Sequence, residues 1–431
     1  MEMRLGKTLV AIRWAQLNKF ERILVVAPKS VLPSWKEELL DEEYAEQDIC
    51  LLEGDWSTRF TKATTTGITW FIVNFAGLRN TRELLEFPWD CIIVDESTRI
   101  KNSKADTTKM LCLDTKHVGH KAILSGHPCP ESEMDYYEQF RFLYGSFMHQ
   151  HNFWYWRRHY CIQYSHGGWE VKGCFVPRIK EEVNRLAFVM TRKQAGIGSK
   201  KIYEKRYVEL NEKQKKLYKQ ADKDFEVTLD GDKEFRTKWV PVKRGWLLKI
   251  ASGFTPDGEV VSNCKLEELQ RLLAGDLKGE KVVVWFRHND ELLYVASKLR
   301  DKKYGVSVYY GDCREADKFT KGDAQILCAQ GKVGMMGLDW SVASTAIYYS
   351  NWDDGEIRVQ SEDRIVHPKK KEPLLYIDLI CRNTVDQDVI DLLRGKRATS
   401  RYFSMKEIKN LTKYTKGKTN GRTKKNSRNG R

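Results

Sequence analysis

The chain has 431 residues, of which 41% are hydrophobic and 31% charged, and its formal net charge is +15. The length allows two or three globular domains, and no apolar run reaches the roughly 20 residues of a membrane span. The ten cysteines include no C-x-x-C pair, and the N-terminus lacks the apolar segment of a secretory signal. We therefore expect reduced thiols and a cytoplasmic protein.

Eight lysines and arginines, and no acidic residue, lie between residues 413 and 431. A basic tail of this kind favours a polyanionic partner. A solvated tail that only raises solubility is the alternative.

The sequence Arg4-Leu5-Gly6-Lys7-Thr8 opens a helical stretch that runs to residue 17. Glycine lets backbone N–H groups close on phosphate oxygens, and the N-terminus of a helix adds partial positive charge. Lys7 would then reach the β- and γ-phosphates of a triphosphate, and the Thr8 hydroxyl would ligate Mg²⁺. The match is partial, because Met1 stands where the full signature has its first glycine.

Short apolar runs then alternate with helical or loop stretches, which is the pattern of a doubly wound α/β domain. The runs span residues 22–27, 49–52, 70–73, 91–94 and 122–124, and a helix is expected over 32–40. In such a domain, functional residues lie at the carboxyl ends of the strands.

One strand end carries two acids. Residues 90–94 run into Asp95-Glu96, and a carboxylate in this place can hold the Mg²⁺ of a nucleotide site. Asp95 would bind the metal, and Glu96 would orient or deprotonate the attacking water. A pair of surface acids at a strand end is the plainer interpretation. The next run, 122–124, ends in Ser125-Gly126-His127-Pro128.

The region 139–262 has less clear periodicity. Residues 153–160 read FWYWRRHY, which fits either a basic aromatic surface for nucleic acid or the core of a small helical subdomain. The nearby histidines and cysteines match no standard zinc-finger spacing. A loop over 228–245 is expected, because this stretch is charged and interrupted by glycine and proline.

A second α/β lobe is predicted from near Lys265. Its strands are expected at 281–286, 306–310, 325–329, 346–349 and 374–380, with a helix over 290–300.

Seen together, these stretches resemble the ordered motifs of superfamily 2 helicases. The matching sequences are 7–8, 25–28, 72–75, 95–97 and 124–128, then Gln330–Asp339 (QGKVGMMGLD) and Gln360–Arg364 (QSEDR). Their spacing is most similar to the Snf-type branch, which holds double-stranded DNA translocases and chromatin-remodeller-like ATPases, and to its phage and bacterial members.

The resemblance implies two RecA-like, doubly wound parallel-sheet lobes with a mostly helical insert. In the inter-lobe region it implies a strand over 207–210 and a helix over 211–218. The implied boundaries are 1–140 for lobe 1, 141–262 for the insert and inter-lobe region, 263–398 for lobe 2 and 399–431 for a disordered basic tail. It implies an ATP- and Mg²⁺-dependent motor on duplex DNA, bound without sequence preference through loops after Ala27, Asn74 and Phe286. Protein partners are not indicated.

The resemblance also implies the site. Lys7, Glu96 and Arg364 would be catalytic, with Arg364 neutralising the γ-phosphate. Thr8 and Asp95 would hold Mg²⁺. The nucleotide-binding residues would be Arg4, Leu5, Gly6, Lys7, Thr8, Gln360, Gly337 and Asp339.

Several positions depart from the family pattern. His367 stands where a second arginine is usual, His127 replaces a threonine, and Arg4 replaces a glycine. Only six residues precede Lys7, so we expect a truncated reading frame or a segment supplied by another chain. These departures leave open a catalytically impaired nucleic-acid-binding module. An RNA helicase is a further alternative, and a P-loop metabolic kinase is disfavoured because it would not need the second lobe.

Overall fold

The computed structural model describes residues 1–394, except 127, 130–131, 165–167, 197, 225, 229–233, 238, 312 and 335–337. The contacts divide the chain into two compact units. Unit 1 comprises residues 1–200, 335–339 and 366–372, and unit 2 comprises the remainder. The predicted tail, 399–431, lies outside the described residues, and the other predicted boundaries stay predictions.

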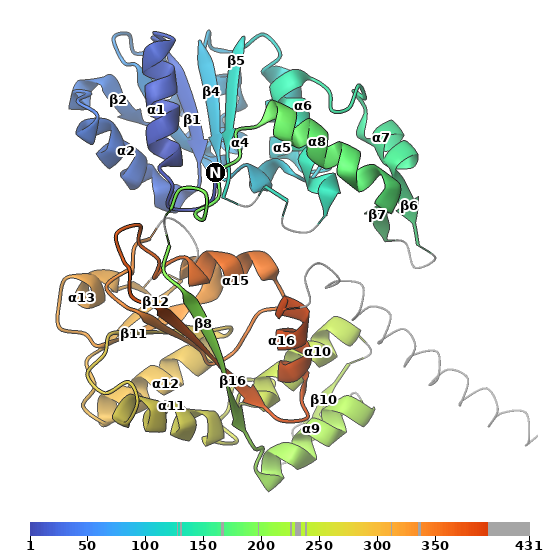
Figure 1. The fold of residues 1–431 in the computed structure, drawn as a ribbon, viewed down its shortest axis with the longest axis vertical. Helices are drawn as coiled ribbons and strands as arrows, with labels where there is room; N and C mark the ends of the chain where they lie inside the picture. The colour runs from blue at the N-terminus through green and yellow to red at the C-terminus, as the bar shows by residue number, and fades with distance from the viewer. Residues whose placement is uncertain are drawn as a thin grey trace, which may run out of the picture. The chain divides into compact units, whose positions relative to one another are not determined.

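Unit 1 is built on a five-stranded parallel sheet of order β2-β3-β1-β4-β5 (Figure 1). The strands are β1 (Ile23–Ala27), β2 (Ile49–Leu51), β3 (Trp70–Asn74), β4 (Cys91–Asp95) and β5 (His120–Leu124). Each predicted apolar run is therefore a strand, shifted by at most two residues at either end. Buried parallel strands are apolar on both faces, so continuous apolar runs identify them well.

Helices cover both faces of this sheet. One face packs against α1 (Lys7–Leu17) and α2 (Leu32–Asp41). The other face packs against α3 (Trp56–Thr64), α4 (Phe75–Asn80), α5 (Asp106–Asp114) and α6 (Tyr136–Tyr144). Alternate side chains of β1 enter the two cores, with Val25 facing α1 and Val26 facing the opposite layer.

The predicted helical insert follows α6. It consists of α7 (Phe153–Tyr160), a hairpin of β6 (Cys161–Gln163) and β7 (Trp169–Val171), and α8 (Val176–Leu186). Trp156 and Tyr160 are buried in its core. The prediction that aromatic residues form the core of a small subdomain is therefore confirmed for these two side chains.

Unit 2 has a seven-stranded sheet of order β13-β12-β14-β11-β15-β16-β8, parallel except for the short edge strand β13. Its strands are β8 (Lys201–Val208), β11 (Val282–Phe286), β12 (Val306–Tyr310), β13 (Cys313–Arg314), β14 (Ile326–Gln330), β15 (Thr345–Tyr348) and β16 (Leu374–Cys381). The predicted fold class, two doubly wound α/β lobes, is confirmed.

The helices of unit 2 include one pair, α11 (Cys264–Ala274) and α12 (Asn289–Asp301), that covers a face of this sheet. The others are α9 (Glu212–Asp224), α10 (Val240–Ala251), α13 (Ala316–Thr320), α14 (Gly331–Gly334), α15 (Gly355–Glu362) and α16 (Val385–Arg394). A small hairpin, β9 (Glu226–Thr228) and β10 (Glu234–Arg236), follows α9.

Two local predictions were wrong. The loop expected over 228–245 contains β10 and the first half of α10. The strand expected over 207–210 begins at Lys201 and pairs with β16 over eight residues. In both places charged residues mask the apolar pattern, because α10 is partly exposed and β8 is an edge strand.

Position 331 has no room for a side chain, because an aromatic ring packs against it. A Cβ on this residue would lie 2.4 Å from Cη2 of Trp352, whose side chain is buried. We expect Gly331→Ala to lower the thermal melting temperature by several degrees, since overpacking costs about 1–3 kcal/mol. Gly245 lies inside α10, and a Cβ added there would meet nothing within 4 Å, so Gly245→Ala is the control and should stabilise the protein. Equal melting temperatures for the two variants would contradict the packing argument.

A buried acid, Glu291, makes the stability of unit 2 depend on pH. It accepts a hydrogen bond from the Ser350 hydroxyl at 2.5 Å. The neighbouring ammonium of Lys265 is paired with Asp386 at 2.7 Å. Burial raises the pKa of Glu291 to about 7 from 4.5.

Between these two pKa values the folded state holds a proton that the unfolded chain has lost, so stability falls as pH rises from about 4.5 to 7. Glu291→Gln removes this titration. We therefore expect the free energy of unfolding of Glu291→Gln, minus that of the unmutated chain, to increase as the pH rises. Urea unfolding measures this difference, which should grow by at most about 1.4 kcal/mol per pH unit. A difference that is the same at pH 5 and pH 8 would refute the assignment.

Candidate nucleotide site

The loop before α1 has the backbone shape of an anion-binding turn. Gly6 caps the helix with φ 72°, and Arg4 also has a positive φ of 67°. The first hydrogen bond of the helix runs from the Val10 N–H to the Gly6 carbonyl at 3.0 Å. The amides of residues 7–9 therefore have no carbonyl within the helix, and an anion at this N-terminus can accept from them.

Lys7 is the first residue of α1. Its ammonium donates to the Glu2 carbonyl at 3.2 Å. It also lies beside the loop after β5, since a Cβ on Gly126 would be 3.5 Å from Nζ and 2.5 Å from Cγ of Met3. The segment before Lys7 thus lies against the end of a second strand, and Gly126 makes room for it. The contact between Met3 and Gly126 was not predicted from the sequence, because no local pattern indicates it.

Asp95 ends β4 and is buried. The indole N–H of Trp35 donates to one carboxylate oxygen at 3.0 Å, and the Glu96 N–H donates to the other at 2.8 Å. Burial raises the pKa of Asp95, while these two hydrogen bonds and the charge of Lys7 oppose that rise. Burial removes the water that would stabilise the charge of this carboxylate. A cation bound beside it would stabilise that charge instead.

The two predicted metal ligands have side-chain oxygens that suit magnesium. The Asp95 carboxylate and the Thr8 hydroxyl are hard oxygen ligands, and Mg²⁺ in nucleotide sites takes one or two protein oxygens together with phosphate and water. Thr8 is the second residue of α1 and half-buried. Among the described residues, no group of three or more His, Cys, Asp or Glu side chains forms a metal cluster. The zinc interpretation therefore has no support there.

Glu96 stands at a strained position. Its φ is 50°, in the left-handed region that a residue with a Cβ rarely adopts, and it caps the 3-10 helix η4 (Ser97–Ile100). Such strain persists only where the surrounding structure enforces it. The turn aims the backbone away from β4 directly after Asp95.

Gln139, on α6, joins the loops that follow β4 and β5. Its amide oxygen accepts from the Ser97 hydroxyl at 2.6 Å, and its amide nitrogen donates to the carbonyls of Pro128 and Asp135, both at 2.7 Å. Gln139 is fully buried. Sequence reasoning missed it, because a glutamine inside an amphipathic helix carries no local signal of such a role.

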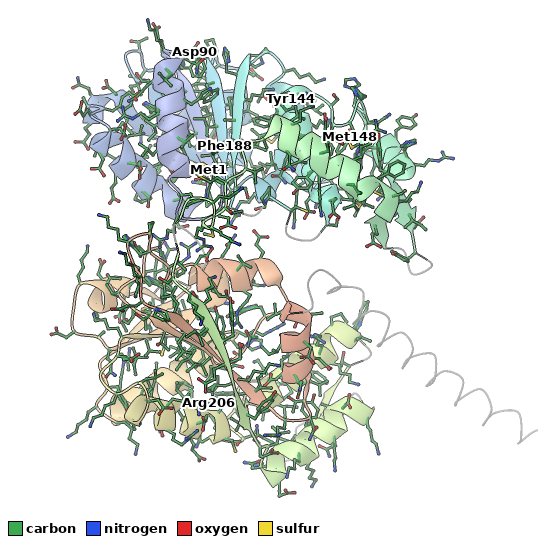
Figure 2. The ribbon with its side chains drawn as sticks, in the orientation of Figure 1. Met1, Asp90, Tyr144, Met148, Phe188 and Arg206 are labelled. Atoms are coloured by element: carbon green, nitrogen blue, oxygen red, sulfur yellow. The ribbon has the colours of Figure 1, made fainter. Side chains whose placement is uncertain are left out.

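Figure 2 allows the two ends of the unit 1 strands to be compared. Met1 is labelled at the carboxyl ends of the unit 1 strands, and Asp90 at their amino ends. Asp90 accepts from the backbone N–H groups of Glu21 and Arg22. Lys7, Asp95 and Glu96 thus lie at the carboxyl ends of the strands, where functional residues of doubly wound sheets are expected.

Two further predicted residues of unit 1 contact each other. The Arg4 guanidinium donates to the Leu338 carbonyl at 3.0 Å and pairs with Asp339 at 3.0 Å. Leu5 is half-buried. Gly337, another predicted nucleotide contact, lies outside the described residues.

Gln360 and Arg364 lie in unit 2, on and just after α15. The Gln360 amide donates to Glu356 at 3.0 Å, and the Nε of Arg364 donates to the Gln360 carbonyl at 3.2 Å. Arg364 is 3% exposed, and its own carbonyl accepts from the Trp340 N–H at 2.9 Å.

A buried network fixes α15 on the sheet. Arg358 pairs with Asp378 of β16 at 2.5 Å and with Glu362 at 2.8 Å, and its guanidinium carbon lies 3.6 Å from the ring centroid of Tyr348. Lys201 of β8 pairs with Glu362 at 3.0 Å. The helix carrying Gln360 is therefore held to three strands, β15, β16 and β8. No motif in the sequence marks Arg358 as this anchor.

Comparisons with known proteins identify a family and several distant relatives. The model of the SNF2-related domain matches residues 1–251. An uncharacterized ATP-dependent helicase of Mycoplasma pneumoniae is 22% identical, covering 92% of this chain and 39% of the relative. The ISWI chromatin-remodeling complex ATPase of Saccharomyces cerevisiae is 23% identical, covering 90% and 37%. A putative ATP-dependent helicase/translocase of Bacillus subtilis is 22% identical, covering 92% and 45%.

The chain thus spans less than half the length of these relatives. Among solved structures, the Sulfolobus solfataricus SWI2/SNF2 ATPase core in complex with dsDNA matches with a TM-score of 0.43 and 19% identity, covering 92% of this chain and 86% of that chain.

Proposed function

The chain belongs to the SNF2-related family, and from this premise we propose that it hydrolyses ATP to move along duplex DNA. The observation that supports this most directly is in unit 1. There a lysine at the N-terminus of a helix and a buried carboxylate with a raised pKa lie close enough to interact. Opposite charges beside a backbone turn that can bind anions suit a triphosphate with its metal.

Each residue has a defined task in this proposal. The amides after Gly6 and the Lys7 ammonium hold the phosphates, and Glu96 orients or deprotonates the attacking water. Thr8 and Asp95 hold magnesium, which when bound neutralises charge on the phosphate oxygens. Arg364 is proposed to neutralise the γ-phosphate during transfer. The Lys7 ammonium has three N–H donors, of which one is directed to the Glu2 carbonyl.

The proposed nucleic-acid partner follows from charge and from the relatives. The net charge of +15 favours a polyanion. The relatives include a chromatin-remodeling ATPase, a putative helicase/translocase and a DNA repair protein of Schizosaccharomyces pombe. Binding to phosphates alone would be independent of sequence and sensitive to salt.

In the described residues no helix is long and apolar enough to span a bilayer.

The test is ATP hydrolysis by this chain alone, with duplex DNA, single-stranded DNA or single-stranded RNA, at two salt concentrations. We expect duplex DNA to stimulate turnover most, and added salt to reduce the stimulation. Displacement of a third strand from a DNA triplex then measures movement along the duplex. Stronger stimulation by RNA would replace this proposal with the RNA helicase.

One observation favours a second candidate, a catalytically impaired module that only binds nucleic acid. The Nδ1 of His367 accepts a hydrogen bond from the Lys369 N–H at 3.1 Å, which holds the imidazole in a local turn. An imidazole held in this way does not replace the forked, permanently charged guanidinium usual at this position. Absence of nucleotide turnover under every condition above, with DNA binding retained, would establish this candidate.

A further inference from the structure

The insert after α6 exposes aromatic side chains that its core does not need. Trp156 and Tyr160 of α7 fill that core and are 0% and 4% exposed. On the outer side of the same helix, Trp154 is 49% exposed and Tyr155 is 68% exposed. The helix therefore buries one set of aromatic residues and presents another to solvent.

Trp154 is held in place although half of it is exposed. The guanidinium carbon of Arg157 lies 4.4 Å from the Trp154 ring centroid and 4.1 Å from that of Trp169, so it is shared between the two indoles. The ammonium of Lys104 lies 5.9 Å from the Trp154 ring. Cation–π contacts of this kind hold the indole in place, and half of its surface remains exposed.

The charge of this face is positive. The helix α7 contains Arg157, Arg158 and His159 and no acidic residue. Within the part of the chain that the structure describes, neither Arg157 nor Arg158 forms an ion pair. Arg158 is exposed, one helical turn from Tyr155.

We propose that this face, formed by Trp154, Tyr155, Arg157 and Arg158, binds single-stranded nucleic acid by stacking unpaired bases on its aromatic rings. Flat side chains beside basic groups are the usual means of holding single strands without sequence preference. Duplex DNA does not explain the exposed rings, because its bases already stack on one another and its outer surface offers phosphates that arginines alone can bind. The inference is independent of ATP hydrolysis and goes beyond movement on duplex DNA.

The test compares two fluorescent probes, a 20-nucleotide oligo-dT and an abasic oligomer of the same length, by anisotropy without ATP. The abasic probe keeps the phosphates and lacks bases to stack. We expect the double variant Trp154→Ala/Tyr155→Ala to raise the Kd for oligo-dT at least tenfold. Its Kd for the abasic probe should change less than twofold. Trp154→Phe should retain most of the affinity.

Two controls keep the outcome interpretable. Trp239→Ala removes another exposed tryptophan, 75% exposed and in unit 2, and should leave oligo-dT binding unchanged. Lys7→Ala should also bind oligo-dT normally, so failure of the motor proposal is distinguishable from failure of this one. Unchanged oligo-dT affinity in the double variant, at an unchanged melting temperature, would overturn the inference. Equal losses for both probes would also overturn it, and would assign the face to phosphate binding.

Discussion

Lys7→Ala is expected to lower DNA-stimulated ATP hydrolysis by about 100- to 1,000-fold, the range for removing one preorganised donor from a charged transition state. The lysine ammonium lies at the turn before α1, where it influences the charge of Asp95. Its loss removes a positive charge from the phosphates and leaves the buried carboxylate without that compensation. The measurement is steady-state phosphate release with saturating duplex DNA.

Two further variants, one at the proposed catalytic base and one surface control, test whether the loss of turnover is caused by a change in the catalytic site. Glu96→Gln keeps the shape of the side chain but cannot accept a proton, so we expect turnover to fall by about 100- to 10,000-fold while nucleotide still binds. Lys109→Ala removes an exposed lysine from α5, where a 3.7 Å pair with Asp106 contributes little stability, and should behave like the unmutated chain. If all three variants hydrolyse ATP at the unmutated rate, unit 1 is not the nucleotide site.

Arg364→Ala is expected to have an effect at least as large, about 1,000- to 100,000-fold on turnover, with little change in nucleotide affinity. An arginine that meets the γ-phosphate only in the transition state contributes to the rate and not to ground-state binding. The ratio of the effects on kcat and KM therefore tests its role. Steady-state kinetics and equilibrium binding of a fluorescent ATP analogue supply the two quantities.

Burial of Arg364 requires its own control. The residue is 3% exposed and its Nε donates to the Gln360 carbonyl, so its removal also affects folding. Arg364→Lys keeps a charge but loses the fork, and should recover stability without recovering most of the rate. An unchanged kcat in both variants would remove Arg364 from the proposed chemistry.

Apolar patterning located every strand of the unit 1 sheet but not every element of the chain. Parallel strands such as β1 and β4 are buried on both faces, and their apolar runs stand out against polar loops. At an edge this signal weakens, and half of the positions in β8 are charged: Lys201, Glu204, Lys205 and Arg206. The start of α10 offered one readable cue, Pro241 in its first turn.

The candidate site was predictable where its chemistry is local in sequence. The Gly6-Lys7-Thr8 turn and Asp95-Glu96 each follow from a few adjacent residues at a helix start and a strand end. Trp35, Gln139 and Arg358 were not predictable, because each acts on a partner 20 to 60 residues away. Such contacts are set by packing of distant elements, which periodicity does not encode.

The position of Gln139 has a mechanical consequence. One amide group is shared by Ser97, Pro128 and Asp135, so displacing any of these partners strains the bonds to the other two. A buried amide that loses such a bond is left with an unsatisfied polar group, which is costly. The loops after β4 and β5 are therefore tied to α6 by a single buried side chain, which holds the turn beside Asp95 and the helix that precedes the insert in a fixed relation.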